Sequence, residues 1–246
     1  MSKRNLNIKL FSDGADLEGI KAMAGNDWID GFTTNPTLMR KAGVEDYKAF
    51  ACDVLGIVPD RPVSFEVFAD EFEEMKQQAL EIASWGKNVF VKIPVMNTKK
   101  EFSGELIRDL AKVGVQLNVT AVMTLHQVSA IVECLDEKVP AIVSVFAGRI
   151  ADTGADPIPI MKEAIAIMQT KPKSELLWAS PRELLNIVQA NDLGCHIITA
   201  TNDILKKLPL LGKDHLEYSL ETVKMFYQDA VSAGFTIPDA QQRMSA

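Results

Sequence analysis

The stretch VSFEVFADEFEEMKQQALEIASWGKNVFVKIPV, residues 63–95, contains one complete repeat of the fold. Its two ends, 63–69 and 88–95, are short runs rich in Val, Ile and Phe, a composition typical of buried strands. Residues 71–85 carry apolar side chains at helical spacing, and Gly86 follows as a helix stop. The apolar stripe consists of Phe72, Met75, Ala79, Ile82 and Ala83. The stretch therefore predicts a strand, a helix and a second strand.

The same alternation extends over the whole chain. The other strand-like runs are 8–13, 30–35, 115–122, 141–148, 175–180 and 195–201. The other helix-like segments are 15–24, 36–55, 99–113, 125–135, 157–169, 181–191 and 202–208. Eight strand-helix units without a linker rich in Pro, Gly or Ser predict an α/β fold, a single (β/α)8 TIM barrel over residues 1–246. We expect an additional C-terminal helix at about 219–232 and a tail at 235–246.

An open, doubly wound sheet is the alternative architecture. Such a sheet binds its ligand where the strand order reverses, commonly with a glycine-rich phosphate loop. Neither GxGxxG nor GxxxxGK[ST] occurs in the sequence. The barrel is therefore favoured.

The composition is that of a folded chain with an acidic balance. Of the 246 residues, 47% are hydrophobic and 24% are charged, which is enough apolar material for a large core. The 33 acidic side chains outnumber the 26 basic ones, and the net charge is −7 with neutral histidines. We expect no nucleic-acid partner, because such a partner requires a basic surface. A few local arginines can still hold a small anion such as a phosphate.

Cysteine and histidine usage points away from disulfide and metal chemistry. Cys52, Cys134 and Cys195 are widely spaced and odd in number, and no CxxC pair occurs. The three histidines show no metal-ligand spacing, so we expect no metal, and we find no cofactor motif. No segment has the ~18 apolar residues of a membrane span or the apolar stretch of a signal peptide. We therefore expect a cytoplasmic protein without a membrane partner.

Polar side chains occur in or just after seven consecutive strand-like runs, where a purely structural strand does not need them. They are Asp13, Thr33, Asn35, Glu66, Lys92, Asn118, Thr120, Ser144, Arg149, Ser180 and Arg182. Catalytic residues of TIM barrels lie at the C-terminal ends of the strands. The sequence therefore predicts a ring of polar groups around one barrel mouth, and Phe146 is the one aromatic residue that we place there.

Lys92 is the most informative of these residues, because the run VFVKIPV around it is otherwise apolar or proline. A structural interpretation places its stem on apolar surface and its ammonium in water. A functional interpretation points it into the barrel, where desolvation favours the neutral amine, which is a nucleophile. The surrounding carboxylates and amides favour the functional interpretation.

Asp13 and Glu66 also allow two interpretations each. Asp13 could bond the turn before the first helix or cap that helix, and Glu66 could be an ion-pair partner of Lys92. Alternatively, both acids transfer protons beside the lysine, since imine formation and carbon–carbon cleavage need protons moved in a fixed order.

Arg149 and Arg182 follow the sixth and seventh expected strands. Many barrels bind a phosphate at their late strands, with charged side chains and helix N-termini. Ser180 would add a hydroxyl donor to the same anion. The structural alternatives are an ion pair between Arg149 and Asp152, and a solvated Arg182 in the first turn of a helix.

A set of motifs, taken in order, resembles the transaldolase family. The motifs are FSDGAD (11–16), GFTTNPTL (31–38), SFEVFAD (64–70), VFVKIP (89–94), LNVTAVMT (117–124), SVFAGRIADTG (144–154) and WASPREL (178–184). The resemblance covers roughly residues 8–234, and TTNP followed by VKIP is its most specific part.

The resemblance implies a class I aldolase-type barrel with its Schiff-base lysine on the fourth strand, where Lys92 falls. It implies that Asp13 is the acid/base at carbon–carbon cleavage and that Glu66 with Thr120 positions a catalytic water. The hydroxyls of the dihydroxyacetone unit are assigned to Asn35, Asn118 and Ser144. The phosphate is assigned to Arg149, Ser180 and Arg182. Thr33 and Phe146 complete the expected substrate-binding set.

The implied reaction is that of a transaldolase in the non-oxidative pentose phosphate pathway. A dihydroxyacetone unit would pass from sedoheptulose 7-phosphate or fructose 6-phosphate to glyceraldehyde 3-phosphate or erythrose 4-phosphate. The expected partners are these phosphorylated sugars and, in a homo-oligomer, further copies of the chain. No cofactor is expected.

Fructose-6-phosphate aldolase, a close relative within the family, is the alternative activity. The resemblance implies that this branch has a glutamine at the position of Glu66 and a tyrosine at that of Phe146, so this chain resembles the transferring enzymes at both positions. The chain is shorter than the large transaldolases, and this length favours the aldolase branch. The chain also departs from the family in FSDGAD, where LDTAD or LDTSD is usual, and in the proline before Arg182, where Phe is frequent.

Two hypotheses of another class remain open. A barrel hydrolase would use Asp13 and Glu66 as a carboxylate pair and would not need the lysine. A noncatalytic barrel that binds sugar phosphates would need the arginines but not Lys92.

Overall fold

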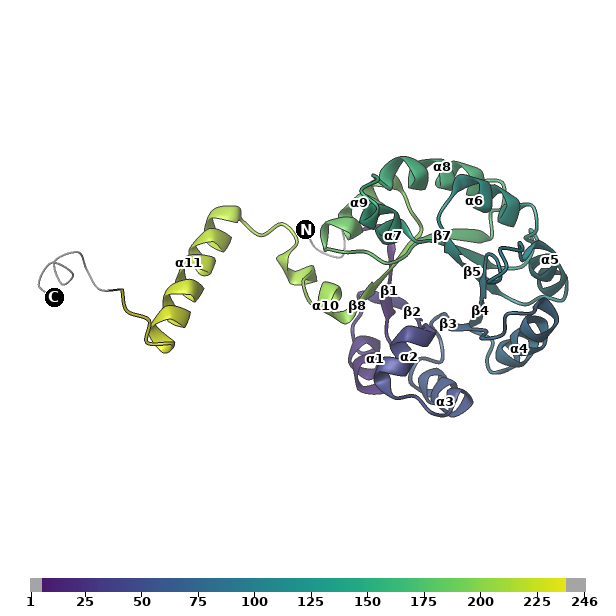
Figure 1. Ribbon diagram of the computed structural model, residues 1–246, viewed down its shortest axis with the longest axis horizontal. Helices are drawn as coiled ribbons and strands as arrows, with labels where there is room; N and C mark the ends of the chain where they lie inside the picture. Colours follow the sequence, from purple (N-terminus) through teal and green to yellow (C-terminus); the bar gives the residue numbers. More distant parts are fainter. Residues whose placement is uncertain (1–5, 238–246) are drawn as a thin grey trace, which may run out of the picture. The chain divides into compact units, whose positions relative to one another are not determined.

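The structure, a computed structural model, describes residues 6–237 and contains a closed barrel of eight parallel strands (Figure 1). The strands are β1 (Lys9–Asp13), β2 (Ile29–Thr33), β3 (Val63–Glu66), β4 (Val89–Pro94), β5 (Leu117–Val122), β6 (Ala141–Val145), β7 (Ser174–Trp178) and β8 (Ile197–Thr201). They follow one another in chain order, and β8 pairs with β1 to close the barrel. The predicted (β/α)8 barrel is therefore confirmed, and the open sheet is not formed.

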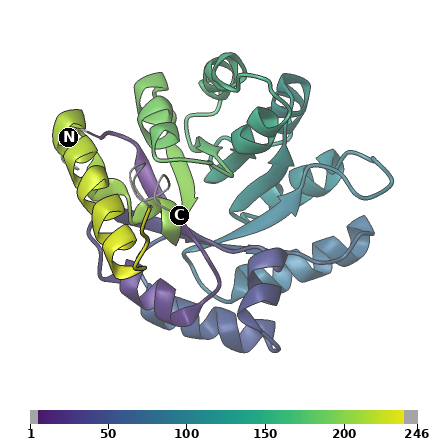
Figure 2. The same cartoon turned by 60° about the vertical axis from the view of Figure 1, so that its left-hand side comes forward.

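The helices between Leu17 and Leu205 lie outside the ring of strands (Figures 1 and 2). Those of the first half are α1 (Leu17–Ala24), α2 (Pro36–Ala42), α3 (Tyr47–Ile57), α4 (Phe72–Ser84) and α5 (Gly104–Lys112). Those of the second half are α6 (Leu125–Val132), α7 (Ala147–Asp152), α8 (Ile158–Met168), α9 (Leu185–Leu193) and α10 (Asn202–Leu205), followed by a 3-10 turn (Leu208–Leu210) and α11 (His215–Ser232). None of the helices within residues 6–237 is long and apolar enough to cross a membrane.

The repeat at 63–95 forms β3, α4 and β4 as its pattern predicts. On α4, Met75, Ala79 and Ile82 are buried, while Phe72 and Ala83 at the margins of the stripe are half-buried. Burial of such side chains stabilises the fold by roughly 1.5–3 kcal/mol for each large one. The helix ends at Ser84 with Trp85 as its C-cap, two residues before Gly86, which the sequence indicated as its stop.

The barrel interior is layered because successive side chains of a strand point to opposite faces. An apolar cluster inside the barrel consists of Phe11, Ile142, Leu177, Ala179 and Ile197, with Phe90 and Phe146 packed against it. Moving two residues along a strand reaches the next inward position, for example from Phe11 to Asp13 or from Phe90 to Lys92. The apolar layer therefore supports a polar layer at the C-terminal ends of the strands.

One expected helix, 36–55, is two helices in the structure. Gly43 adopts a left-handed conformation (φ 70°) that ends α2, and the Asp46 side chain then caps α3 by accepting a hydrogen bond from the Ala49 N–H. Glycine reaches this conformation without steric cost. The break brings Tyr47, the first residue of α3, to the end of β3.

The sixth strand is shorter than its sequence indicates. The strand expected at 141–148 ends at Val145, and residues 147–152 turn into α7. In this turn, Gly148 lies against the backbone of Ser180, and a Cβ on residue 148 would fall 1.5 Å from the Ser180 carbonyl oxygen. Only glycine permits this approach, which joins the two late loops that carry the arginines.

Among the described residues, 6–208 form one compact unit and 209–237 form another. This segment contains α11, which begins at His215 and not at about 219, because Asp214 caps it by accepting hydrogen bonds from the Leu216 and Glu217 N–H groups. Of the expected tail, residues 238–246 lie outside the described residues. That residues 1–246 form a single domain stays a prediction.

Candidate active site

Every residue that the sequence singled out as catalytic or substrate-binding lines one cavity of about 560 Å³. They are Asp13, Thr33, Asn35, Glu66, Lys92, Asn118, Thr120, Ser144, Phe146, Arg149, Ser180 and Arg182. The cavity lies at the C-terminal ends of the strands, the position at which barrel enzymes bind their substrates. The structure thus brings the predicted residues together, whereas their individual roles stay predictions.

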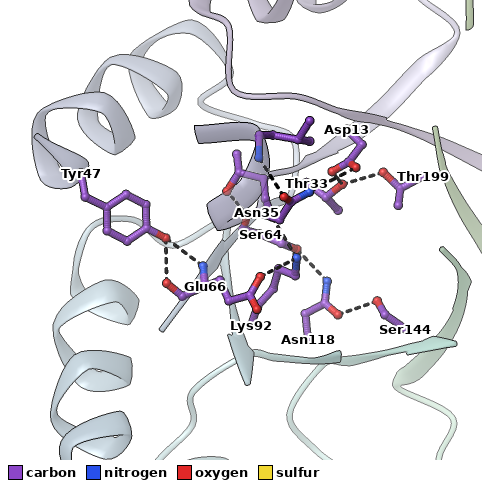
Figure 3. Close-up of polar contacts among 12 residues, drawn as sticks. Asp13, Thr33, Asn35, Tyr47, Ser64, Glu66, Lys92, Asn118, Ser144 and Thr199 are labelled. Atoms are coloured by element: carbon purple, nitrogen blue, oxygen red, sulfur yellow. Dashed lines mark hydrogen bonds and ion pairs between the residues drawn. The ribbon is translucent and has the colours of Figure 1, made fainter. Parts of the chain in front are cut away.

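Lys92 lies on β4 directly opposite Glu66 in the register with β3. Its Nζ atom is 2.9 Å from Glu66 Oε2 (Figure 3). The same atom donates a hydrogen bond of 2.9 Å to the Thr34 carbonyl oxygen. The side chain is only 8% exposed, so its ammonium does not extend into water. This arrangement differs from the structural interpretation, which placed the ammonium in water. The ion pair with Glu66 is present, and both side chains lie at the wall of the cavity.

Asp13, at the end of β1, faces the cavity and does not cap α1, a role that Asp16 performs by accepting from the Gly19 N–H. Thr33 Oγ1 lies 2.7 Å from Asp13 Oδ1 and 2.6 Å from Thr199 Oγ1, and Asn35 Nδ2 reaches Asp13 Oδ2 at 3.5 Å (Figure 3).

Protein atoms surround most of the Asp13 carboxyl, and the rest of it faces the cavity. Desolvation raises its pKa, and this effect exceeds the opposing influence of the Lys92 charge and of the Thr33 hydrogen bond. A carboxyl with a raised pKa is better suited to accept and return a proton near neutral pH. This environment is what an acid/base group requires.

Asn118 and Ser144 form a buried polar chain across β3, β5 and β6. The Asn118 amide donates to Ser64 Oγ at 3.0 Å and accepts from Ser144 Oγ at 2.7 Å (Figure 3). Both of its ends are therefore held, which fixes the amide plane. Groups held in this way can bind substrate hydroxyls without first losing rotamer freedom.

A distortion of β5 sets the direction of the next side chain along that strand. The register with β6 shifts between Val119 and Val122, and Ala121 has a φ of 61°, which a residue with a Cβ adopts at a cost. Bulges of this kind commonly re-aim a side chain beside an active site. Here the bulge places both Thr120 and Ala121 on the cavity wall.

The two arginines have different partners. The guanidinium of Arg149 lies over the Phe146 ring, 5.6 Å from its centroid. Arg182 donates from Nε to Asp152 Oδ1 at 2.8 Å and from Nη2 to Asp152 Oδ2, so Asp152 pairs with Arg182 and not with Arg149. These hydrogen bonds lower the pKa of Asp152. Arg182 also precedes α9, which begins at Leu185, and is therefore not a first-turn residue.

Several contributors lie outside the predicted set. Thr199 on β8 and Lys41 at the end of α2 also line the cavity, and the main chain of Thr34 holds the Lys92 ammonium. Thr199 follows from extending the ring of polar residues to the eighth strand. The backbone role of Thr34 and the contact that Tyr47 makes with Glu66 have no sequence signal. Within residues 6–237, no group of three or more His, Cys, Asp or Glu side chains is placed to hold a metal ion.

Comparison with known proteins places the chain among relatives of one kind. The family model described as Transaldolase/Fructose-6-phosphate aldolase matches residues 10–244. A protein of Dehalococcoides mccartyi named "Probable transaldolase" is 34% identical over 202 residues, which cover 82% of this chain and 90% of the relative. A second "Probable transaldolase", from Streptococcus equi subsp. zooepidemicus, is 31% identical over 229 residues, with 92% and 99% covered.

The fold is also similar to that of more distant solved structures. The structure of 3-keto-L-gulonate-6-phosphate decarboxylase from Vibrio cholerae matches with a TM-score of 0.53 at 14% identity and covers 80% of this chain and 88% of that one. The structure of KGPDC from Streptococcus mutans matches with a TM-score of 0.54 at 11% identity, with 82% and 90% covered. At this level of identity the likeness concerns the barrel alone.

Proposed function

Since the chain belongs to the transaldolase/fructose-6-phosphate aldolase family, we propose that it is a transaldolase that works through a Schiff base on Lys92. In this reaction a dihydroxyacetone unit passes from sedoheptulose 7-phosphate or fructose 6-phosphate to glyceraldehyde 3-phosphate or erythrose 4-phosphate. The observation that carries the proposal is the buried Lys92 ammonium, 2.9 Å from the Glu66 carboxylate, in a cavity lined by hydroxyl, amide and guanidinium groups.

The first step is attack by the lysine on the ketone of the donor sugar. Glu66 takes a proton from the Lys92 ammonium, directly or through a water, and the neutral amine adds to the carbonyl carbon. The carbinolamine then loses its hydroxyl as water when the protonated acid returns a proton to it. The product is a protonated imine, which accepts the electron pair of the bond that breaks next.

Asp13 performs the next proton transfer. It removes the proton from the C4 hydroxyl as the C3–C4 bond breaks, and an aldose phosphate leaves while the three-carbon fragment stays on Lys92 as an enamine. The raised pKa of Asp13 fits this role, because the same carboxyl must give the proton back when the acceptor aldehyde forms the new bond. Hydrolysis of the final imine returns the free lysine.

The remaining residues of the cavity bind the sugar. Asn118 and Ser144, held in their buried chain, are placed to bond the hydroxyls of the dihydroxyacetone unit together with Asn35. Arg149, Arg182 and Ser180 are assigned to the phosphate. A phosphate at Arg182 would replace Asp152 as the partner of a bidentate guanidinium, which binds both kinds of oxyanion well.

The choice between the two activities of the family rests on Glu66 and Phe146. Both lie on the cavity wall. A phenyl ring at 146 offers no proton to the enamine, whereas a phenol there could protonate it and release free dihydroxyacetone. We therefore favour transfer over aldol cleavage. We further propose a place in the non-oxidative pentose phosphate pathway, a cytoplasmic location and a homo-oligomeric assembly.

Borohydride trapping tests the proposal. The protein is incubated with fructose 6-phosphate and sodium borohydride, digested and analysed by mass spectrometry. We expect the reduced adduct on the peptide that contains Lys92, and turnover when erythrose 4-phosphate is added. A carboxylate-pair hydrolase would release product without labelling, and a binding barrel would do neither. Either of these results would overturn the Schiff-base mechanism.

A further inference from the structure

Strand β2 is too short to pair with the whole of its neighbour β3, so the last residues of β3 have no partner on β2. The Phe32 N–H donates to the Pro62 carbonyl at 2.9 Å, and the Thr34 N–H donates to the Ser64 carbonyl at 3.1 Å. In a parallel pair this pattern repeats every two residues. The next repeat would join the Glu66 N–H to the Thr34 carbonyl and the Glu66 carbonyl to the N–H of residue 36.

Neither of these two hydrogen bonds is present in this chain, and the Glu66 N–H donates to Tyr47 Oη instead. Residue 36 is a proline, which has no N–H, and it begins α2. The Thr34 carbonyl accepts a hydrogen bond from Lys92 Nζ at 2.9 Å, and no bond joins it to the Glu66 N–H. Both peptide groups of Glu66 that face β2 therefore lose their strand partners at the point where the Glu66 side chain enters the cavity.

A single hydroxyl replaces the missing strand. Tyr47 Oη accepts a hydrogen bond of 2.8 Å from the Glu66 N–H and donates one of 2.9 Å to the Glu66 carbonyl oxygen (Figure 3). A hydroxyl can do both at once because it carries one proton and two lone pairs. The main chain of Glu66 is thus held on both sides, by Tyr47 on one and by β4 on the other, where the register pairs Glu66 with Lys92.

Tyr47 is itself held firmly. It is the first residue of α3, whose cap is the Asp46 side chain. Its ring packs against Phe68 at 4.6 Å and Trp85 at 5.3 Å between centroids, and lies in a T-shaped arrangement with Phe65 at 6.2 Å. Desolvation raises the pKa of the phenol above its ordinary value, so the hydroxyl keeps the proton that it donates.

We propose that Tyr47 is a positioning residue for the chemistry of Lys92: it fixes the main chain at the end of β3 so that the Glu66 carboxylate stays 2.9 Å from the lysine ammonium. The proposal rests on the proposed function, since it assigns Tyr47 to the steps that Glu66 assists, the formation and hydrolysis of the imine. Tyr47 does not line the cavity and is not assigned a contact with substrate.

The test uses Tyr47→Phe, which keeps the packed ring and removes only the hydroxyl, with Tyr227→Phe as its matched control. Tyr227 lies on α11 and is 71% exposed. The first measurement is amide hydrogen exchange by NMR. In Tyr47→Phe we expect faster exchange at the Glu66 N–H, whereas the Val67 N–H, which donates to the Lys92 carbonyl at 3.2 Å, should stay protected. Unchanged exchange at Glu66 would overturn the proposal.

The second measurement is a double-mutant cycle of kcat with Glu66→Gln. Tyr47→Phe alone should lower kcat by about tenfold, within the roughly 100-fold that a misplacement on the order of 1 Å can cost. KM should change by less than about twofold, because the sugar contacts are intact. In the Glu66→Gln background, Tyr47→Phe should have almost no further effect, since its influence passes through the carboxylate. Tyr227→Phe should match the wild type.

The outcomes separate this proposal from the function on which it rests. If Tyr47→Phe lowers kcat equally in both backgrounds, the hydroxyl acts through general stability and the positioning role is wrong. If the wild-type protein is trapped on Lys92 by borohydride while Tyr47→Phe keeps full activity, only the positioning role fails. If the wild-type protein is not trapped at all, the Schiff-base function fails, and the assignment of Tyr47 to imine chemistry fails with it.

Discussion

Glu66 and Lys92 are paired in two ways: their backbones are in register between β3 and β4, and their side chains meet with Nζ 2.9 Å from Oε2. The pair lies between the aromatic packing around Tyr47 on one side and the Asn118 chain on the other, since Lys92 is also in register with Asn118. This geometry fits both interpretations of Glu66, as a structural ion-pair partner of Lys92 and as the group that exchanges a proton with it. What distinguishes them is whether the lysine reacts.

Replacement of Lys92 by arginine should abolish covalent labelling and lower turnover by at least ~10³-fold, because arginine stays protonated and cannot form an imine. The change retains the positive charge beside Glu66, so thermal unfolding should stay cooperative. Borohydride trapping followed by mass spectrometry, with a parallel circular dichroism melt, measures both effects. A Lys92→Arg enzyme that still turns over would revive the hydrolase that uses Asp13 and Glu66.

Replacement of Asp13 by asparagine should stabilise the protein at neutral pH while removing activity. Burial raises the pKa of Asp13 in the folded protein, so ionisation of this carboxyl lowers the free energy of unfolding. This destabilisation is absent at a pH below the pKa of the unfolded chain, and it is complete at a pH above the pKa of the folded protein. Asp13→Asn should therefore be more stable than the wild type at pH 7 to 8, and the gain should shrink as the pH falls toward about 4. Urea unfolding over this pH range measures it, and a gain that grows on acidification would contradict the assigned direction.

Replacement of Arg182 by alanine should raise KM for phosphorylated sugars. A charged hydrogen bond contributes about 1.5–3 kcal/mol, which corresponds to roughly 10- to 150-fold in kcat/KM. Unphosphorylated ketoses serve as the control, since they do not use the guanidinium. Steady-state kinetics with both substrate types gives the comparison, and equal losses for the two would exclude Arg182 from phosphate binding.

Replacement of Phe146 by tyrosine should shift the enzyme from transfer toward aldol cleavage. With fructose 6-phosphate alone, we expect the wild-type protein to release little free dihydroxyacetone and Phe146→Tyr to release more, because a phenol beside the enamine can protonate it. The assay measures dihydroxyacetone with and without erythrose 4-phosphate. Rapid release by the wild-type protein without an acceptor would instead assign it to the aldolase branch.

Replacement of Gly148 by alanine should destabilise the barrel. The added Cβ would fall 1.5 Å from the Ser180 carbonyl oxygen, so one of the two backbones must move, at a cost of about 1–3 kcal/mol or more. Gly56, inside α3, is the matched control, because an added Cβ there meets no atom within 4 Å and should stabilise by about 0.4–1 kcal/mol. Thermal unfolding of both variants measures the difference in their melting temperatures. Equal melting temperatures would contradict the prediction.

The sequence placed most of the site because the relevant information is local. Alternation along each strand separates inward from outward side chains, and a closed parallel barrel gathers all strand ends at one mouth. Lys92 in VFVKIPV or Asn118 in LNVTAV could therefore be assigned to the cavity before any contact was known. The same rule reaches Thr199, which only required the pattern to be followed to the eighth strand.

The amino-acid sequence by itself determined the barrel, the order of its strands and the residues that face its mouth, since these follow from the period of apolar side chains over a few neighbouring positions. Only the tertiary structure decided which of these groups touch. Asp152 pairs with Arg182, 30 residues away, and Tyr47 bonds the peptide groups of Glu66, 19 residues away. Such contacts depend on strand register, on the early end of β2 at a proline and on loops packed backbone to backbone, and hydrophobic periodicity carries no information about any of these.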